Sequence, residues 1–335
     1  MFVIRPITLQ DLDTLEMFAH ATQTGMLSLP RNRRLLKREI QASMKSFQKS
    51  VRHPHDEIYL FVLEDIETGT VGGSCGLHAK SGTRRPLYFF RVEPPDAPAK
   101  NGTDDHRLLY PMTLHNGPTE LCALYLTPTW RKRHLGRLLS FSRLLFIAGN
   151  RRRFNKTVIA ALRGVIKGST SPFWEGLGKH FMDLTLEEAI ALGHSSEEWI
   201  AKRLPRYPIY ASLLSKEVQK VMGKANAASQ PALKMLLDEG FQLSSWIDMF
   251  DGGPVVTAPK KSIHTIKAGR LATVEAITSD QIHSPRWIMS NNDLNFRACS
   301  GKLKIVKKAR VVINENAADA LHIKRGEQIR YAPLP

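Results

Sequence analysis

The sequence has few cysteines, and this shortage excludes two classes of protein. Three of its 335 residues are cysteines, and Cys75, Cys122 and Cys299 lie far apart in apolar surroundings. An odd and widely spaced set of this kind indicates neither a disulfide framework nor a zinc site. We therefore expect three buried free thiols and no bound metal.

Long hydrophobic runs are also missing. The longest run, around 138–148, is interrupted by Arg143 and is shorter than the roughly 20 residues that cross a bilayer. The first residues, 1–6, do not combine a charged stretch, an apolar core and a small-residue cleavage site. These absences predict a cytoplasmic protein that neither enters a membrane nor carries a secretion signal.

Acidic residues are few, and positive charge is abundant. The chain has 48 lysines and arginines against 31 acidic residues, which gives a formal net charge of +17. Such a field attracts anions, and nucleic acid, an anionic membrane surface and a phosphate-rich cosubstrate all remain open. The basic patches at 31–38, 151–153 and 302–310 carry no recognised nucleic-acid motif and no interleaved aromatic platform, so we expect no nucleic-acid partner.

Hydrophobic periodicity predicts an α/β (α+β) protein of two domains. Residues 1–254 form the larger domain, with a helical insertion at about 164–225, and residues 255–335 form a small β-rich domain. A segment rich in Pro, Gly, Asn and Asp at 80–118 is a long excursion that could cover a site. The other predicted elements are a strand at 2–8, helices at 12–19 and 32–49, a hairpin of 58–65 with 70–77, a strand at 119–127, a helix at 136–152, a strand at 157–162, a helix at 231–239 and a strand at 241–249.

The most informative pattern is a strand that leads directly into a basic helix start. Free backbone N–H groups at a helix N-terminus, flanked by cationic side chains, form an anion site. A basic helix start is, however, more often a solvated face, so this pattern alone leaves both interpretations open. The candidate anion-binding residues are Arg131, Lys132, Arg133, His134, Gly136 and Arg137.

The order of these elements resembles the acyl-coenzyme A N-acyltransferase fold of the acetyltransferase superfamily. Residues 131–136 resemble the superfamily's pyrophosphate loop, Arg/Gln-x-x-Gly-x-Gly/Ala, with His134 in place of the first glycine. The resemblance implies a mixed, largely antiparallel sheet and a coenzyme A (CoA) thioester as cosubstrate. It also implies that the pantetheine arm pairs with the strand at Leu124, Tyr125 and Leu126.

A closer resemblance is to the arginine N-succinyltransferase family of bacterial arginine degradation, and it covers essentially the whole chain. It implies succinyl transfer from succinyl-CoA to the α-amino group of L-arginine, in an assembly of at least two copies. The motifs that carry it include Val3-Ile4-Arg5-Pro6, Ser28-Leu29-Pro30, Glu120-Leu121-Cys122, Pro128-x-Trp130-Arg131, Arg163-Gly164, Ser171-Pro172-Phe173-Trp174, Glu239-Gly240-Phe241 and Asp248-x-Phe250-Asp251-Gly252-Gly253-Pro254.

The resemblance assigns catalytic and substrate roles with one serious departure. The histidine that the family is thought to use as proton donor falls at Asn226, and asparagine cannot carry that proton. Glu120 is the candidate for drawing the proton off the amine through a water, although a salt bridge or a strand-edge charge is an alternative role. Asp248 and Asp251 are candidate partners of the arginine guanidinium, and Arg163 is a candidate clamp for its carboxylate. A turn for Asp251 and a strand-edge pair for Arg163 are structural alternatives.

Two other functions stay open on the sequence alone. The first keeps the fold and the CoA site but uses another amine or acyl donor, or works only weakly, because Asn226 and His134 lie where the chemistry is expected. The second is a nonenzymatic binding protein, which rests on the net charge and on the basic patches at 31–38, 151–153 and 302–310.

Overall fold

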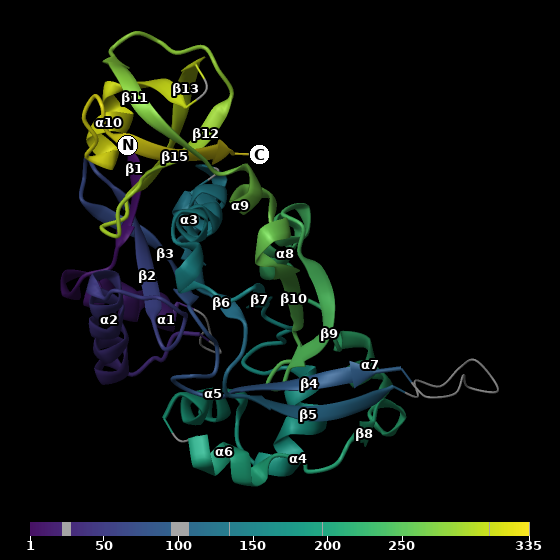
Figure 1. The fold of residues 1–335 in the computed structure, drawn as a ribbon. Coiled ribbons are helices and arrows are strands. Elements are labelled where there is room, and N and C mark those ends of the chain that lie inside the picture. The colour runs from purple at the N-terminus through teal and green to yellow at the C-terminus, as the bar shows by residue number, and fades with distance from the viewer. Residues whose placement is uncertain (22–27, 95–106, 134, 196, 308, 335) are drawn as a thin grey trace.

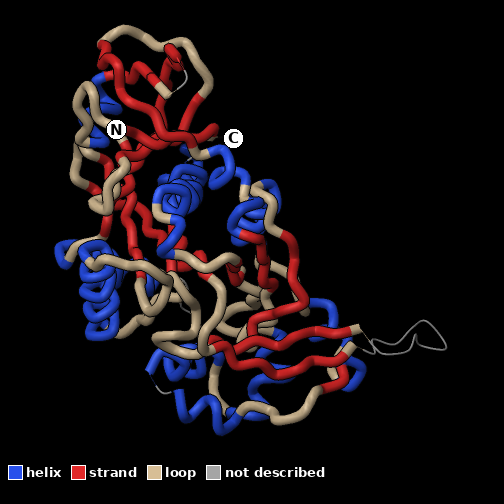
Figure 2. Tube along the Cα trace, in the orientation of Figure 1, coloured by secondary structure: helices blue, strands red, loops and turns tan. Residues whose placement is uncertain are grey.

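The computed structural model describes residues 1–21, 28–94, 107–133, 135–195, 197–307 and 309–334. Within these residues a single hydrogen-bonded sheet runs through the molecule, and helices pack against both of its faces (Figures 1 and 2). The central part of the sheet has the strand order β1-β2-β3-β6-β7-β10-β9-β4-β5-β8. In this part β6 and β7 are parallel and all other neighbouring strands are antiparallel, so the predicted mixed, largely antiparallel sheet is confirmed. These strands are β1 (Phe2–Pro6), β2 (Ile58–Asp65), β3 (Thr70–His78), β4 (Leu87–Glu93), β5 (Leu108–Leu114), β6 (Thr119–Leu126), β7 (Thr157–Ala161), β8 (Ile209–Tyr210), β9 (Gln242–Asp248) and β10 (Pro254–Pro259).

Strand β2 shows why helices cover both faces of the sheet. Its residues alternate between two cores, because successive side chains of a strand point to opposite faces. Leu60 and Val62 pack with α1 (Leu12–His20) and α2 (Arg33–Gln48), whereas Tyr59 and Phe61 pack with α3 (Leu135–Gly149). A strand that is apolar on both faces therefore fixes a helix layer on each side.

The predicted helical insertion is present, and it forms a core of its own around Trp174. Its helices are α4 (Lys179–Met182), α5 (Leu186–Ser195), α6 (Glu197–Arg203) and α7 (Lys216–Val221), and α8 (Gln230–Asp238) follows. Tyr88 and Phe90 of β4 and Leu109 of β5 belong to the same core as Trp174. Two strands of the segment 80–118, β4 and β5, thus pair antiparallel with each other and pack against the insertion.

Strand β5 was not predicted, because Pro111 interrupts its pattern. Proline lacks the N–H that a central strand must donate. Strand β8 pairs only with Leu108 and Leu109, so no strand on that side of β5 requires an N–H from Pro111. On the other side Pro111 lies opposite Phe90 of β4.

The C-terminal strands form a small barrel. The ring β12-β15-β11-β14-β13 closes because β12 also pairs with β13, and β13 joins the barrel to β1. The barrel elements are β11 (Arg270–Thr278), β12 (Arg286–Asn291), β13 (Ala298–Lys307), β14 (Arg310–Asn314), α10 (Glu315–Leu321) and β15 (Gln328–Pro333). Strand β10, which the sequence assigned to the C-terminal domain, pairs instead with β7 and β9 of the central sheet. This pairing favours a domain boundary after α9 (His264–Ala268) rather than at residue 254.

No described helix is long and apolar enough to span a bilayer.

Candidate active site

A cavity opens where the two parallel strands separate. Strands β6 and β7 pair at Thr119–Val158 and Glu120–Ile159. A cavity of about 650 Å³ follows, lined by 121–126 of β6 and 160–163 of the β7 end. Backbone groups alternate sides along a strand, so beyond Glu120 those of β6 that face β7 have no strand partner. An extended ligand with its own amide groups can therefore complete the ladder there.

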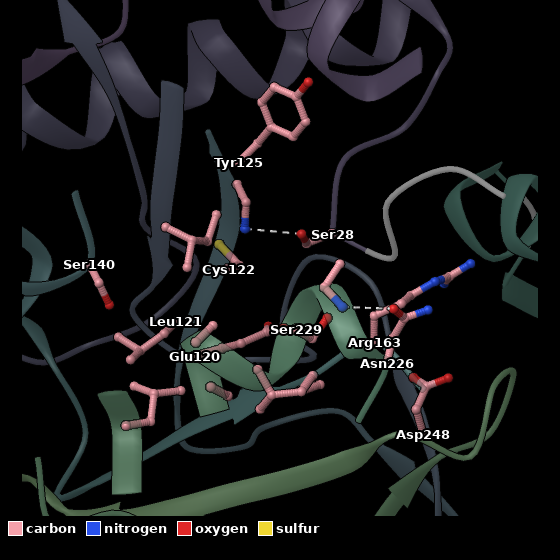
Figure 3. Close-up of a pocket in the computed structure, with 18 of the residues that line it drawn as sticks. Ser28, Glu120, Leu121, Cys122, Tyr125, Ser140, Arg163, Asn226, Ser229 and Asp248 are labelled. Carbon is pink, nitrogen blue, oxygen red and sulfur yellow. Dashed lines mark hydrogen bonds between the residues drawn. The ribbon is translucent and has the colours of Figure 1, made fainter. Parts of the chain in front are cut away.

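A β-bulge shapes the β6 wall of this cavity. Ser74 lies opposite Tyr125 and Gly76 opposite Cys122, so β6 carries one residue more than β3 in this interval. Ala123 takes up the extra residue with a φ of 52°. Its N–H donates to Ser28 Oγ at 3.0 Å, and its carbonyl accepts from Ser74 Oγ at 3.0 Å (Figure 3 shows the first bond). Two serines thus stabilise a left-handed residue that redirects the strand beside the cavity.

The start of α3 lies at the cavity mouth. Arg131 lines the cavity, and its Nε donates to the carbonyl of Leu126 at 3.2 Å. A Cβ at Gly136 would contact only the Leu126 side chain, at 3.8 Å, so this position leaves open space beside the first turn. The positive end of the α3 dipole and the Arg131 guanidinium suit a phosphate.

The turn before α3 is anchored on the sheet by Trp130. Its ring packs edge-on against Phe2, and a Cβ added at Gly72 of β3 would lie 2.4 Å from its ring. Glycine at position 72 is therefore required for the turn to sit where it does.

Not every residue of the predicted anion loop is brought to the cavity. Arg137 lines a separate, smaller cavity together with Phe141 and Met235. His134 and the side chains of Lys132 and Arg133 lie outside the described residues.

Glu120 stands at the point where β6 and β7 separate. Its side chain is 8% exposed and lines the cavity, and its carboxyl group makes no hydrogen bond to another described residue. Burial raises the pKa of Glu120 to about 7, against the opposing charge of Arg85. A carboxyl group with this pKa can accept a proton near neutral pH.

Arg163, Asn226 and Asp248 gather on one side of the cavity in the view of Figure 3, with Ser140 on the other side. The carboxyl Oδ1 of Asp248 accepts from the backbone N–H groups of Phe250 and Asp251 at 2.8 and 3.2 Å. Burial and the neighbouring Asp251 carboxylate raise the pKa of Asp248.

Asp251 is not brought to the cavity. It is fully buried behind Arg163, whose Nη1 lies 3.3 Å from Asp251 Oδ2, and its Oδ1 accepts from the N–H of Gly253 at 2.8 Å. A Cβ at Gly164 would lie 2.2 Å from the carbonyl oxygen of Asp251. Glycine at position 164 thus lets the segments around Arg163 and Asp251 approach closely, so that Asp251 can hold Arg163 in place.

Comparisons with known proteins cover the whole chain. The family described as "Arginine N-succinyltransferase beta subunit" matches residues 2–265, and its C-terminal domain matches residues 270–333. Curated proteins named "Arginine N-succinyltransferase" from Escherichia coli (strain 55989 / EAEC) and from Shigella flexneri are each 35% identical over 339 residues, which is 100% of this chain and 98% of theirs. This chain belongs to the arginine N-succinyltransferase family.

A solved structure of another protein of this kind shows the same fold. It is described as arginine/ornithine succinyltransferase subunit AI from Pseudomonas aeruginosa, and it aligns with a TM-score of 0.88 at 29% identity over 100% of this chain and 99% of that one. The fold expected from the resemblance is therefore confirmed.

In this member of the family, Asn226 has a structural role. Its Oδ1 accepts from the N–H of Ala228 at 3.0 Å and so caps the short turn Ala227–Ser229. Its own N–H donates to the carbonyl of Arg163 at 2.8 Å. Asn226 also lines the cavity.

Two further arginines, Arg85 and Arg143, line the cavity and were not predicted as site residues. Arg85 contacts His194 Nδ1 of α5, which ties the excursion to the insertion. The sequence does contain a sign of Arg143: a charged residue within the apolar run 138–148 indicates a buried cation. The described residues contain no group of three or more His, Cys, Asp or Glu side chains that could hold a metal.

Proposed function

We propose that this protein transfers a succinyl group from succinyl-CoA to the α-amino group of L-arginine. The observation that carries the proposal is the cavity that runs from the start of α3, between the separated β6 and β7, to the buried carboxyl of Glu120. Similarity over the full length to proteins named for this reaction supports the choice of substrates.

The donor fits the cavity in one direction. Its pyrophosphate meets the first turn of α3 beside Arg131 and Gly136, and its pantetheine amides pair with β6 along 124–126. The thioester then reaches the deeper part of the cavity, near Ala123 and Glu120. Arginines outnumber acidic groups on the lining, and both lining acids have raised pKa values, which favours a polyanionic ligand.

The chemistry needs a neutral amine, an oriented carbonyl and an exit for the thiolate. Glu120 as carboxylate takes the proton of the attacking ammonium through a water, and the amine nitrogen then bonds to the thioester carbon. A free N–H of β6 donates to the oxyanion of the tetrahedral intermediate. The nitrogen of this intermediate gives its second proton to solvent. Collapse then breaks the carbon–sulfur bond, and the sulfur leaves with the electron pair and is protonated by solvent, because Asn226 has no proton to give.

The acceptor occupies the side of the cavity opposite Ser140. Asp248 pairs with the guanidinium of the substrate, and Arg163, held by Asp251, pairs with its carboxylate. Asp251 contributes by positioning Arg163 and not by touching the substrate.

A substrate matrix tests the proposal. Thiol release is measured with succinyl-CoA or acetyl-CoA and with arginine, ornithine or lysine, and each product is identified by mass. We expect succinylarginine as the main product. Faster thiol release with another donor or amine would replace the substrate assignment, and no turnover with any pair, despite donor binding, would refute the enzymatic function.

Two further expectations belong with this function. We propose an assembly of two or more copies, which light scattering of the full chain after size exclusion tests, and a mass of one chain would contradict it. We also propose a cytoplasmic location, which fractionation of the source cells tests.

A further inference from the structure

Arg143 is a buried cation on the wall of the cavity, and the proposed mechanism does not use it. Gly136, Ser140 and Arg143 fall on one face of α3, and all three line the cavity. Arg143 is 2% exposed, and on a straight helix it lies about 10 Å further in than Gly136. Its guanidinium reaches back to Ser140 and across to the carbonyl of Cys122 of β6, so it lies about one turn beyond Gly136.

The contacts of Arg143 leave its charge without a counterion. Nε donates to the carbonyl of Ser140 at 3.2 Å, Nη2 to Ser140 Oγ at 3.0 Å and Nη1 to the carbonyl of Cys122 at 3.4 Å. All three acceptors are neutral, and no carboxylate of the described residues lies within 4.0 Å of the guanidinium. A guanidinium has five N–H donors, so two remain for a ligand.

The other cavity arginines have different positions or engagements. Arg131 lies at the mouth, Arg163 pairs with Asp251, and Arg85 contacts His194. Arg143 instead lies beside Cys122, immediately before the bulge at Ala123 where the thioester is expected. A buried charge of this kind is costly unless a partner neutralises it.

We propose that Arg143 binds the free carboxylate of the donor's succinyl group and thereby selects succinyl-CoA over neutral acyl-CoAs. The inference rests on the proposed function and deepens it. The acceptor groups Arg163 and Asp248 lie on the other side of the cavity from Ser140, which Arg143 contacts (Figure 3). The amine thus attacks from one side while the succinyl tail extends toward the other.

The test compares two donors with the same four-carbon chain. Succinyl-CoA carries the terminal carboxylate and butyryl-CoA does not, so their kcat/KM ratio reports on that group. Arg143→Met removes the charge and keeps an apolar chain of similar length, and Arg143→Lys keeps the charge. Arg153→Met is the matched control, because Arg153 is also buried and bonds to neutral acceptors but does not line the cavity.

We expect Arg143→Met to lower kcat/KM for succinyl-CoA by about 10- to 100-fold, the usual size of a hydrogen bond to a charged group. The value for butyryl-CoA and the affinity for CoA itself should stay unchanged, and Arg143→Lys should recover part of the succinyl-CoA activity. Arg153→Met should leave the donor ratio as it is in the wild type. Ser140→Ala, which removes one acceptor that orients Arg143, is a milder variant should Arg143→Met fail to fold, and it should shift the ratio in the same direction.

Equal losses with both donors in Arg143→Met would overturn the inference, since they would mean that Arg143 supports the fold or the leaving thiolate. An unchanged donor ratio would overturn it as well. Calorimetric binding separates this inference from the proposed function: if the wild type is inactive with every acyl-CoA, a preference for binding succinyl-CoA over butyryl-CoA that disappears in Arg143→Met still supports the role of Arg143. An equal affinity for both donors would then refute it.

Discussion

Glu120→Gln should make the protein more stable while making it a poorer enzyme. Burial raises the pKa of Glu120 from 4.5 to about 7 in the folded chain, so folding disfavours the charged carboxylate. Stability is therefore lost as the pH rises from 4.5 through 7, and the full cost is present above pH 7. At 1.36 kcal/mol per pKa unit this cost is about 3 kcal/mol, and we expect the variant to recover about 1 to 3 kcal/mol because the amide adds donors of its own.

Denaturant unfolding of both proteins at pH 5 and pH 8 measures this effect. The difference in unfolding free energy between variant and wild type should be larger at pH 8 and small at pH 5. Subtracting the wild type removes the contributions of other titrating groups, such as Asp248. Glu57→Gln is the matched control, since Glu57 is also buried but accepts from Lys49 Nζ and the N–H of His55, and its loss should destabilise the protein.

The same variant tests the catalytic role. The kcat/KM of the wild type should fall as the pH drops below about 7, because a protonated Glu120 cannot accept the proton. Glu120→Gln should lose about 10²- to 10⁴-fold and should no longer show this pH dependence. A stability difference that does not grow between pH 5 and pH 8 would refute the burial argument, and full activity in the variant would refute the role as base.

Three further substitutions probe the rest of the site. Gly72→Ala forces a Cβ toward the Trp130 ring, so initial rates should show a donor KM raised about 10- to 100-fold with little change in the KM for arginine; an unchanged donor KM would contradict the anchoring role. Asp251→Ala breaks a buried ion pair and should lower the free energy of unfolding by about 3 to 5 kcal/mol, measured with denaturant. Asp248→Asn should leave the stability of the protein unchanged and raise the KM for arginine. The reverse pattern would exchange the roles of the two aspartates. Asn226→His should raise kcat without tightening donor binding, and stopped-flow or steady-state rates that stay the same would show that the added imidazole is not placed to donate a proton.

The elements that the sequence predicted well are those whose side chains obey a single period. The apolar run of β2 and the apolar faces of α1 to α3 are buried in the two cores that flank the sheet, so the pattern of each predicts its structure. Strand β5 was missed because Pro111 conflicts with strand pairing, a conflict that a nearly free edge removes. Strand β10 was placed in the wrong part of the sheet because its pattern does not say which strands it will pair with.

The site was predictable as a set of residues but not as an arrangement. Glu120 and residues 124–126 belong to one predicted strand, and all of them line the cavity. Nothing local distinguishes Asp248 from Asp251, and the difference comes from the close approach at Gly164, which buries Asp251 and turns it toward Arg163. Arg143 could have been found from its place on the face of a helix that also carries a glycine and a serine.

Asn226 stands where the resemblance implies a proton-donating histidine, and we expect this exchange to slow the reaction. Its amide oxygen is committed to the N–H of Ala228, and its Nδ2 makes no hydrogen bond to a described residue, so it can donate to a sulfur but cannot transfer a proton. A thiol with a pKa near 8.5 leaves as a tolerable thiolate near neutral pH. The loss of a general acid is worth about 10²- to 10⁴-fold and falls on kcat, because substrate binding does not require the proton. The geometry therefore predicts an enzyme that binds its donor normally and turns over slowly, with product release of the thiolate favoured as the pH rises.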